Sequence, residues 1–360
     1  MGLRTGLRNA SGAIAALLMV DTLAAQQPPP PPPSYPPPNP GITEYAVSTL
    51  GFGAFGITAG PDGALWFTYD ATIGRITPSG VISQYTLPAS GSVPGPIVPG
   101  PDGALWFIDT LGSTFRIGRI TTSGSVTEYT IPDTAPFPQA ITSGSDGALW
   151  FTEQNGNKIV RVTTTGNFTE YPVPTAASSP WGIATGSDGA LWFTETAAAK
   201  IGRMTTSGSF TEYALPTAAS SPTAIAAGPD GALWFIESGK IGRVTTSGTI
   251  TEYAASVQYP GAITSGPDGA IWFSGSGSLG RITMSGSITT YSAGAAVSGL
   301  AFSPDGALWF TVYSSNWIGR FSPSLAVTPI TREWAMSIFG VLLVIAAGLR
   351  ARRKTVRRAS

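Results

Sequence analysis

The sequence contains no histidine and no cysteine, and only 11% of its 360 residues are charged. The absence of histidine excludes serine–histidine and cysteine–histidine nucleophile pairs, a histidine general base and histidine metal ligands. The absence of cysteine excludes disulfides, zinc–thiolate sites and thiol nucleophiles, so an extracellular location has to be argued from other features. Any chemistry must therefore come from carboxylates, hydroxyls, lysine or arginine.

The N-terminal region differs in composition from the rest of the chain. Two arginines precede a mostly apolar run at residues 12–20, and small residues follow, which predicts a secretory signal peptide over residues 1–25. Asp21 interrupts this pattern, and a buried N-terminal helix is the alternative. Residues 26–41 are rich in proline, and we interpret them as a stiff polyproline II linker rather than as a ligand for a proline-recognition domain.

The C-terminal segment 326–360 combines an apolar run with a basic tail. Residues 334–349 carry no charge and are followed by six arginines and lysines, so they predict a short membrane-spanning helix whose basic end stays in the cytoplasm. The sequence Thr-Pro-Ile-Thr-Arg-Glu-Trp at 328–334, with this run and the arginines, resembles the IPTL-CTERM family of bacterial C-terminal sorting signals. The resemblance implies sorting machinery as a partner, and an ordinary anchor is the alternative. Both interpretations place the upstream chain outside the cytoplasm, at the cell surface or secreted.

The charge balance of the central region excludes one class of partner. Residues 41–327 contain 11 basic and 18 acidic side chains, a net charge of −7. A nucleic-acid-binding protein needs a clustered positive face, and this region offers none. We therefore predict no nucleic-acid partner.

The same region repeats one motif seven times. The motif is Asp-Gly-Ala-Leu-Trp-Phe, with Ile271 as its one internal departure, and each copy is followed by Ile-Gly-Arg-like and Thr-Glu-Tyr-like steps. A period near 40 residues, built from short segments rich in threonine, isoleucine and aromatics, is typical of a propeller blade. The aspartates, which we interpret as turn formers, are Asp62, Asp102, Asp146, Asp188, Asp230, Asp268 and Asp305. We assign the seven motif tryptophans to packing between blades.

One repeat predicts four antiparallel strands, at residues 182–185, 190–194, 200–205 and 209–214. The seventh unit lacks its Thr-Glu-Tyr strand, and the missing copy stands at the start of the repeats, at residues 43–45. The prediction is an all-β fold: a seven-bladed β-propeller over 42–325, closed by an N-terminal strand and followed by a C-terminal hydrophobic helix.

Two sets of charges should pair across strands. Closure of the ring predicts that Glu44 lies near Arg320. Within four units an arginine and a glutamate stand nine residues apart around a Ser-Gly turn, which predicts direct cross-strand ion pairs. These pairs are Arg119/Glu128, Arg161/Glu170, Arg203/Glu212 and Arg243/Glu252.

The combined repeat, Pro-x-x-Ile-x-x-Gly-x-Asp-Gly-Ala-Leu-Trp-Phe-Thr-Glu to Lys-Ile-Gly-Arg-x-Thr-x-x-Gly-x-x-Thr-Glu-Tyr, resembles the virginiamycin B lyase (streptogramin lyase) family over nearly all of 42–325. The resemblance implies a carbon–oxygen lyase that opens a cyclic depsipeptide by elimination, with histidines, glutamates and Mg²⁺ at the channel mouth. Gly261 and Ser298 stand at the places of the family's histidines, and Ala296 and Tyr313 near those of its glutamates. None of these can serve as a base near neutral pH, so by that mechanism the chain should be inactive.

The longer loops of a propeller lie on one face and are the candidate place for a site. Four carboxylates occupy the same position just beyond Trp-Phe in successive repeats, and they could coordinate Mg²⁺ or Ca²⁺, although no cofactor is required. They are Asp109, Glu153, Glu195 and Glu237. The alternative is that each is an independent loop residue paired with a nearby lysine.

On the same face, Trp181 and Gln139 stand at the start of the innermost strands of their blades, and Phe55 and Thr223 stand at the equivalent places in two other blades. An aromatic with polar neighbours at a channel mouth could bind a peptide, a glycan or a surface protein. Two hypotheses therefore remain. The first is an exported, non-catalytic binding propeller, and the second is a divergent metal-assisted lyase or hydrolase that uses the four carboxylates.

Overall fold

The computed structural model describes residues 39, 41–47, 54–133, 136–255, 261–275, 277–312 and 317–322. Within them the secondary structure consists of 28 strands. In chain order these are β1 (Ile42–Ala46), β2 (Ile57–Ala59), β3 (Leu65–Tyr69), β4 (Thr72–Ile76), β5 (Ile82–Thr86), β6 (Ser92–Pro99), β7 (Leu105–Leu111), β8 (Thr114–Ile120), β9 (Val126–Thr130), β10 (Pro138–Ser143), β11 (Leu149–Glu153), β12 (Lys158–Val162), β13 (Phe168–Pro172), β14 (Pro180–Thr185), β15 (Leu191–Glu195), β16 (Lys200–Met204), β17 (Phe210–Ala214), β18 (Ile225–Ala227), β19 (Leu233–Glu237), β20 (Lys240–Val244), β21 (Ile250–Ala254), β22 (Ile263–Ser265), β23 (Ile271–Gly275), β24 (Ser278–Ile282), β25 (Ile288–Ser292), β26 (Val297–Phe302), β27 (Leu308–Val312) and β28 (Trp317–Phe321).

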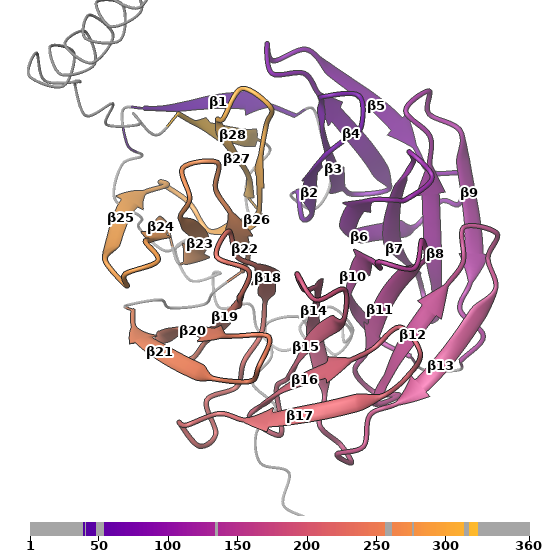
Figure 1. The fold of residues 1–360 in the computed structure, drawn as a ribbon. Helices are drawn as coiled ribbons and strands as arrows, with labels where there is room; N and C mark the ends of the chain where they lie inside the picture. Colours follow the sequence, from indigo (N-terminus) through magenta and orange to yellow (C-terminus); the bar gives the residue numbers. More distant parts are fainter. Residues whose placement is uncertain are drawn as a thin grey trace, which may run out of the picture. The chain divides into compact units, whose positions relative to one another are not determined.

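The strands form seven four-stranded antiparallel sheets, which we number as blades 1 to 7 from β2–β5 to β26–β28. In blades 1 to 6 four consecutive strands lie side by side in chain order. The first strand of each blade contacts the first strand of the next, and β2 contacts β26, so the inner strands close a ring (Figure 1). The predicted seven-bladed propeller is confirmed.

The seventh blade is completed from the other end of the chain. Strand β1 pairs with β28, with Ile42 opposite Phe321, and Tyr45 stacks on Trp309 with ring centroids 5.1 Å apart. The predicted N-terminal closing strand is therefore confirmed. Glu44, however, lies opposite Gly319 and makes no ion pair with Arg320, which binds Asp305 instead.

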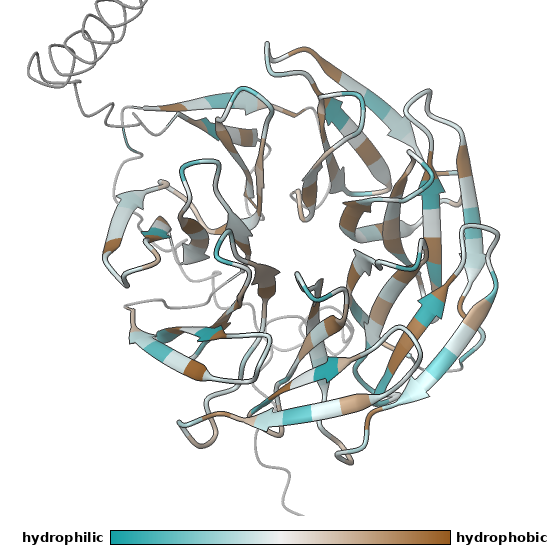
Figure 2. Ribbon diagram, in the orientation of Figure 1, coloured by the Kyte–Doolittle hydropathy of each residue, from teal (hydrophilic) through white to brown (hydrophobic). Residues whose placement is uncertain are grey.

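Apolar side chains gather between the blades. All five residues of β15 are buried, whereas the outer strand β17 has only half-buried and exposed positions, and Figure 2 shows more hydrophilic segments on the outer strands. The motif tryptophans are wholly buried and contact the neighbouring blade, as predicted. The glycine of the Ile-Gly-Arg step makes room for the motif phenylalanine, since a Cβ added to Gly202 would lie 2.1 Å from the Phe193 ring.

The turn aspartates have a second role besides their turns. Asp188 accepts a hydrogen bond from the Trp192 indole N–H at 3.1 Å and pairs with Arg203 at 2.7 Å. Burial opposes ionisation of Asp188, but the bonds from Arg203 and Trp192 hold its pKa below the usual value. Aspartate–arginine pairs occur in all seven blades, so the arginine of each repeat forms its ion pair with the turn aspartate of the same blade.

The predicted arginine–glutamate pairs are wrong for the same reason in all four units. In blade 4, Arg203 lies opposite Thr211, and Glu212 lies opposite Gly202. Five residues (205–209) separate the paired ends of β16 and β17, and this odd number shifts the register by one residue from the predicted pairing. Arginine and glutamate therefore point to opposite faces of the sheet. The glutamates instead bind a cation near the start of the third strand: Arg116, Lys158, Lys200 or Lys240.

Several predictions fall outside the described residues. These are the signal peptide at 1–25, the linker at 26–41 apart from residues 39 and 41, and the segment 326–360 with its hydrophobic helix. Across the residues that are described, no helix has the length and apolar character needed to cross a membrane.

Candidate functional site

The candidate site lies where the inner strands begin, on the face opposite the Asp-Gly and Ser-Gly turns, which we call the loop face. In blade 4 the register shifts between Pro180 and Ile183, so Trp181 and Gly182 together oppose Thr194. This is a β-bulge, a device that re-aims a side chain out of the regular alternation. The register shifts at the same place in blades 2, 3 and 7.

We call the equivalent residues at this position, one per blade, the mouth ring. They are Phe55, Gly95, Gln139, Trp181, Thr223, Gly261 and Ser298. The ring contains the four predicted binding residues, all half-buried: Gln139, Trp181 and Thr223 stand on consecutive blades 3 to 5, and Phe55 stands on blade 1. Gln139 is oriented by a hydrogen bond from its Nε2 to Gln154 Oε1 at 2.9 Å.

Buried threonines hold the backbone of the mouth ring. Thr152 Oγ1 donates to the Trp181 carbonyl and Thr194 Oγ1 to the Thr223 carbonyl, both at 2.6 Å. Thr194 also accepts from the Gly182 N–H at 2.9 Å, so one hydroxyl joins two blades. The same arrangement links Thr68 to Gly95 and Thr311 to Phe55. We call these four wholly buried residues the threonine belt.

The sequence analysis missed the threonine belt. Its signal is a hydroxyl residue directly after Trp-Phe, which recurs in blades 1, 3, 4, 6 and 7 and is replaced by isoleucine in blades 2 and 5. That recurrence was visible in the repeat, but threonine also suits any strand position. Only the structure identifies its partner, a carbonyl of the next blade.

Trp181 differs from the tryptophans of the blade cores. Each core tryptophan packs against a tyrosine of its own blade, as Trp192 does on Tyr213, and its indole N–H donates to a turn aspartate or, in blade 7, to Ser303. Trp181 packs on no other ring, and its N–H has no acceptor, within the part of the chain that the structure describes. It therefore presents an aromatic face and a free donor on a fixed backbone.

The four predicted metal ligands are wholly buried on the second strands: the three glutamates end their strands, and Asp109 lies two residues before the end of β7. Each faces a cation of its own blade, as Glu195 faces Lys200 across the β15–β16 pair. No three carboxylates converge as metal ligands among the described residues, so the structure does not bring these four together. Asp109 differs from the three glutamates because it forms an ion pair with Arg116, which also binds Glu128 at 2.7 Å.

Burial controls the protonation of the three glutamates. It raises the pKa of Glu153 and Glu195 to about 7 and also raises the pKa of Glu237. At Glu195 the Glu212 carboxylate adds to the rise, while Ser178 and Lys200 oppose it. Neither carboxylate oxygen of these three glutamates has a hydrogen-bond partner within the described residues. Because they are sealed from solvent, they cannot contact a substrate as the structure stands.

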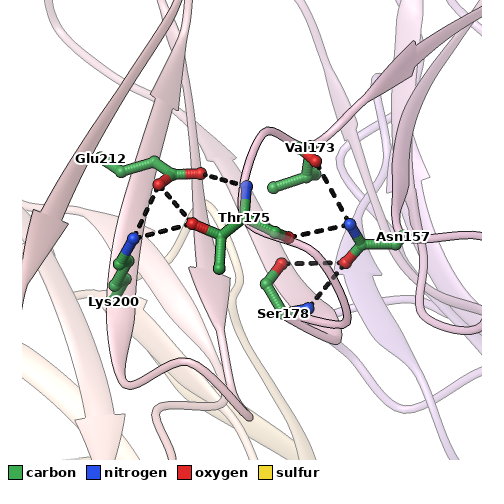
Figure 3. Close-up of polar contacts among 6 residues, drawn as sticks. All are labelled: Asn157, Val173, Thr175, Ser178, Lys200 and Glu212. Carbon is green, nitrogen blue, oxygen red and sulfur yellow. Dashed lines mark hydrogen bonds and ion pairs between the residues drawn. The ribbon is translucent and has the colours of Figure 1, made fainter.

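A polar network fixes the linker that leads into Trp181 (Figure 3). Glu212 accepts from the Thr175 backbone N–H at 3.0 Å and from Lys200 at 2.8 Å. On the other side of the linker, Asn157 donates to the Thr175 carbonyl at 3.0 Å and accepts from the Ser178 N–H at 2.8 Å. Residues of blade 3 and of blade 4 therefore both hold the linker that precedes Trp181.

The places that correspond to the family's catalytic groups are occupied differently. A Cβ added to Gly261 would lie 2.8 Å from the Val297 carbonyl oxygen, so no side chain fits there without a backbone shift. Ser298 donates to the Ala54 carbonyl at 2.9 Å. Ala296 is apolar and half-buried, and Tyr313 lies outside the described residues. The described residues at these places do not fit a Mg²⁺ site.

Comparisons with known proteins agree with the resemblance of the repeat. The sequence matches the virginiamycin B lyase family over residues 37–256 and 185–335. A structure of streptogramin B lyase has a TM-score of 0.72 and 38% identity, covering 78% of this chain and 97% of that chain. A catalytically inactive virginiamycin B lyase from Staphylococcus aureus with quinupristin, in which one histidine is replaced by alanine, has a TM-score of 0.73 and 39% identity over 78% of this chain and 99% of that one.

One further neighbour shares the fold alone. It is the extracellular domain of a hybrid two-component system protein from B. thetaiotaomicron, at 16% identity and a TM-score of 0.65, covering 81% of this chain and 44% of that chain. No curated protein matches the sequence. Since the family match spans the propeller and the lyase structures align over nearly their whole length, the chain belongs to the virginiamycin B lyase family.

Proposed function

We propose that this chain is an exported, non-catalytic member of the virginiamycin B lyase family that binds a ligand at the mouth ring around Trp181. The observation that carries the proposal is the half-buried, unpartnered indole of Trp181 on a backbone fixed by the threonine belt. Ligand sites combine apolar and aromatic surface with a few placed polar groups. Gln139 and Thr223, on the adjacent blades, supply such groups.

The absence of catalysis is supported by what stands at the family's reactive positions. The S. aureus relative is described as catalytically inactive with one histidine replaced by alanine, and this chain has no histidine at all. The backbone around Gly261 leaves no room for a side chain. Loss of the acid–base groups explains both observations more simply than their relocation to other positions in the chain.

The competing hypothesis is a metal-assisted lyase or hydrolase that uses Asp109, Glu153, Glu195 and Glu237 with Mg²⁺ or Ca²⁺. It requires carboxylates that converge on one ion and meet a substrate. Their separation and burial argue against it.

One experiment separates the two hypotheses. The full chain is incubated with quinupristin, with and without millimolar Mg²⁺, and linearised product is measured by mass spectrometry. We expect no product above a no-protein control and no calorimetric binding of Mg²⁺ or Ca²⁺. In parallel, saturation-transfer NMR compares wild type with Trp181→Ala against neutral oligosaccharides, neutral peptides and quinupristin. Product formation, or a panel in which no ligand distinguishes the two proteins, would contradict the proposal.

Export is supported by the basic, apolar and small residues of 1–25 and by the sorting-signal-like segment 326–360. On this proposal residues 334–349 anchor the chain in the membrane, at least transiently, until sorting machinery acts on it. Cell fractionation should find the propeller outside the cytoplasm, with an N-terminus near Ala25. Leu17→Arg should retain it inside, because a charge disrupts the apolar run. Equal export of both proteins would refute the signal-peptide assignment.

A further inference from the structure

The mouth ring carries no charge. All seven of its residues are neutral, although the central region has a net charge of −7. The carboxylates at this end of the second strands, such as Glu195, are buried and face cations of their own blades. A charged ligand would find no opposite charge in the ring, so the chemistry favours an uncharged ligand.

The backbone of the ring is not free to recognise a peptide. Strand addition needs open N–H and C=O groups along a strand. The Trp181 and Thr223 carbonyls already accept from the threonine belt, and the Gly182 N–H already donates to Thr194. Recognition at this arc must therefore come from side chains.

The side chains of the arc suit a sugar. The face of an indole is electron-rich and attracts the C–H groups of a pyranose ring, while the free Trp181 N–H can donate to a ring hydroxyl. The Gln139 amide and the Thr223 hydroxyl each donate and accept, which matches the dual character of sugar hydroxyls. Gln139 Nε2 has a second N–H besides the one it donates to Gln154, and among the described residues the Thr223 hydroxyl makes only a long bond of 3.5 Å to the Ile236 carbonyl. The two stand on the blades that flank that of Trp181, one on either side of it.

We infer that Gln139, Trp181 and Thr223 form a binding subsite for a neutral glycan, with one sugar ring stacked on Trp181. The inference rests on the proposed function and adds the ligand class to it. The network around Asn157 and Glu212 holds the linker before Trp181, so the indole is presented without much ordering cost on binding (Figure 3).

Calorimetric titration of the full chain with cellohexaose, maltohexaose and chitohexaose tests the inference. We expect at least one of them to bind, with affinity weakened about tenfold or more by Trp181→Ala and about threefold by Gln139→Leu. Trp181→Phe keeps a ring without the N–H and should lose less than Trp181→Ala. Trp317→Ala is the matched control, since Trp317 is a half-buried tryptophan outside the mouth ring that packs on Phe310. It should leave the affinity unchanged.

The outcomes separate the inference from the proposed function. If no sugar binds but quinupristin or a neutral peptide binds in a Trp181-dependent way, the glycan inference is overturned and the proposed function stands. If a sugar binds equally to wild type and to folded Trp181→Ala, as judged by circular dichroism, both fall. If nothing binds, both fall as well.

Discussion

Replacing Glu195 with glutamine should stabilise the protein above neutral pH and leave it unchanged in acid. Burial raises the pKa of Glu195 from its ordinary value of 4.5 to about 7 in the folded protein. The folded carboxyl thus stays protonated over a range in which the unfolded chain is already ionised. Stability from this group is fully present below pH 4.5 and is lost progressively as the pH rises through about 7. Glutamine resembles the protonated form and removes this dependence.

The magnitude follows from the two pKa values. A separation from 4.5 to about 7 corresponds to about 3 kcal/mol when both states are fully ionised, and the opposing effect of Lys200 is already part of that separation. The free energy of unfolding of Glu195→Gln should therefore equal that of wild type near pH 4.5 and exceed it by up to about 3 kcal/mol near pH 9.

Urea unfolding at a series of pH values measures this difference. Glu212→Gln provides a control of opposite sign. Burial opposes ionisation of Glu212, but the bonds from Lys200 and Thr175 hold its pKa below the usual value. The contribution of Glu212 to stability is therefore present above pH 4.5 and lost as the pH falls. Glu212→Gln should thus be less stable than wild type at neutral pH. A constant difference between Glu195→Gln and wild type from pH 4.5 to 9 would refute the reasoning.

Three further predictions concern the ring itself, and urea unfolding checks each of them. Thr194→Val should cost about 1–3 kcal/mol, because it leaves the Thr223 carbonyl without its donor; no loss would contradict a structural role for the threonine belt. Gly202→Ala should cost about 1–3 kcal/mol, since its Cβ overlaps the Phe193 ring. Tyr45→Ala should cost about 2 kcal/mol, because it removes the aromatic stack of the closing blade; an unchanged midpoint would show that closure does not depend on it.

The fold was predictable because every repeat carries its own strand and turn signals. Seven copies of one motif and a displaced Thr-Glu-Tyr step predict both the blade number and the partner of β1. The ion pairs were not predictable. Arg203 and Glu212 are correctly spaced for a turn with an even number of residues, and the five-residue connection places them on opposite faces.

The candidate site was predictable in position but not in chemistry. Equivalent placement in the repeat identifies Gln139, Trp181 and Thr223 as neighbours on one face. The bulge that re-aims Trp181 and the hydroxyl of Thr152 that fixes it are interactions between strands and between blades, which sequence spacing does not encode. For the same reason the sequence could not show that Glu195 is sealed within its own blade rather than open to the channel.

The pairing of β1 with β28 has a consequence for the order in which the chain becomes stable. Ile42 is synthesised early, but its partner Phe321 emerges only when the whole ring has been made. Until then blade 7 has no outer strand, and the nascent protein carries an open sheet edge. Removal of β1 leaves β28 as the exposed edge, whereas a stop before residue 317 removes β28, exposes β27 and leaves β1 without a partner. Both truncations should produce aggregation-prone proteins, and the C-terminal one should be the less stable of the two.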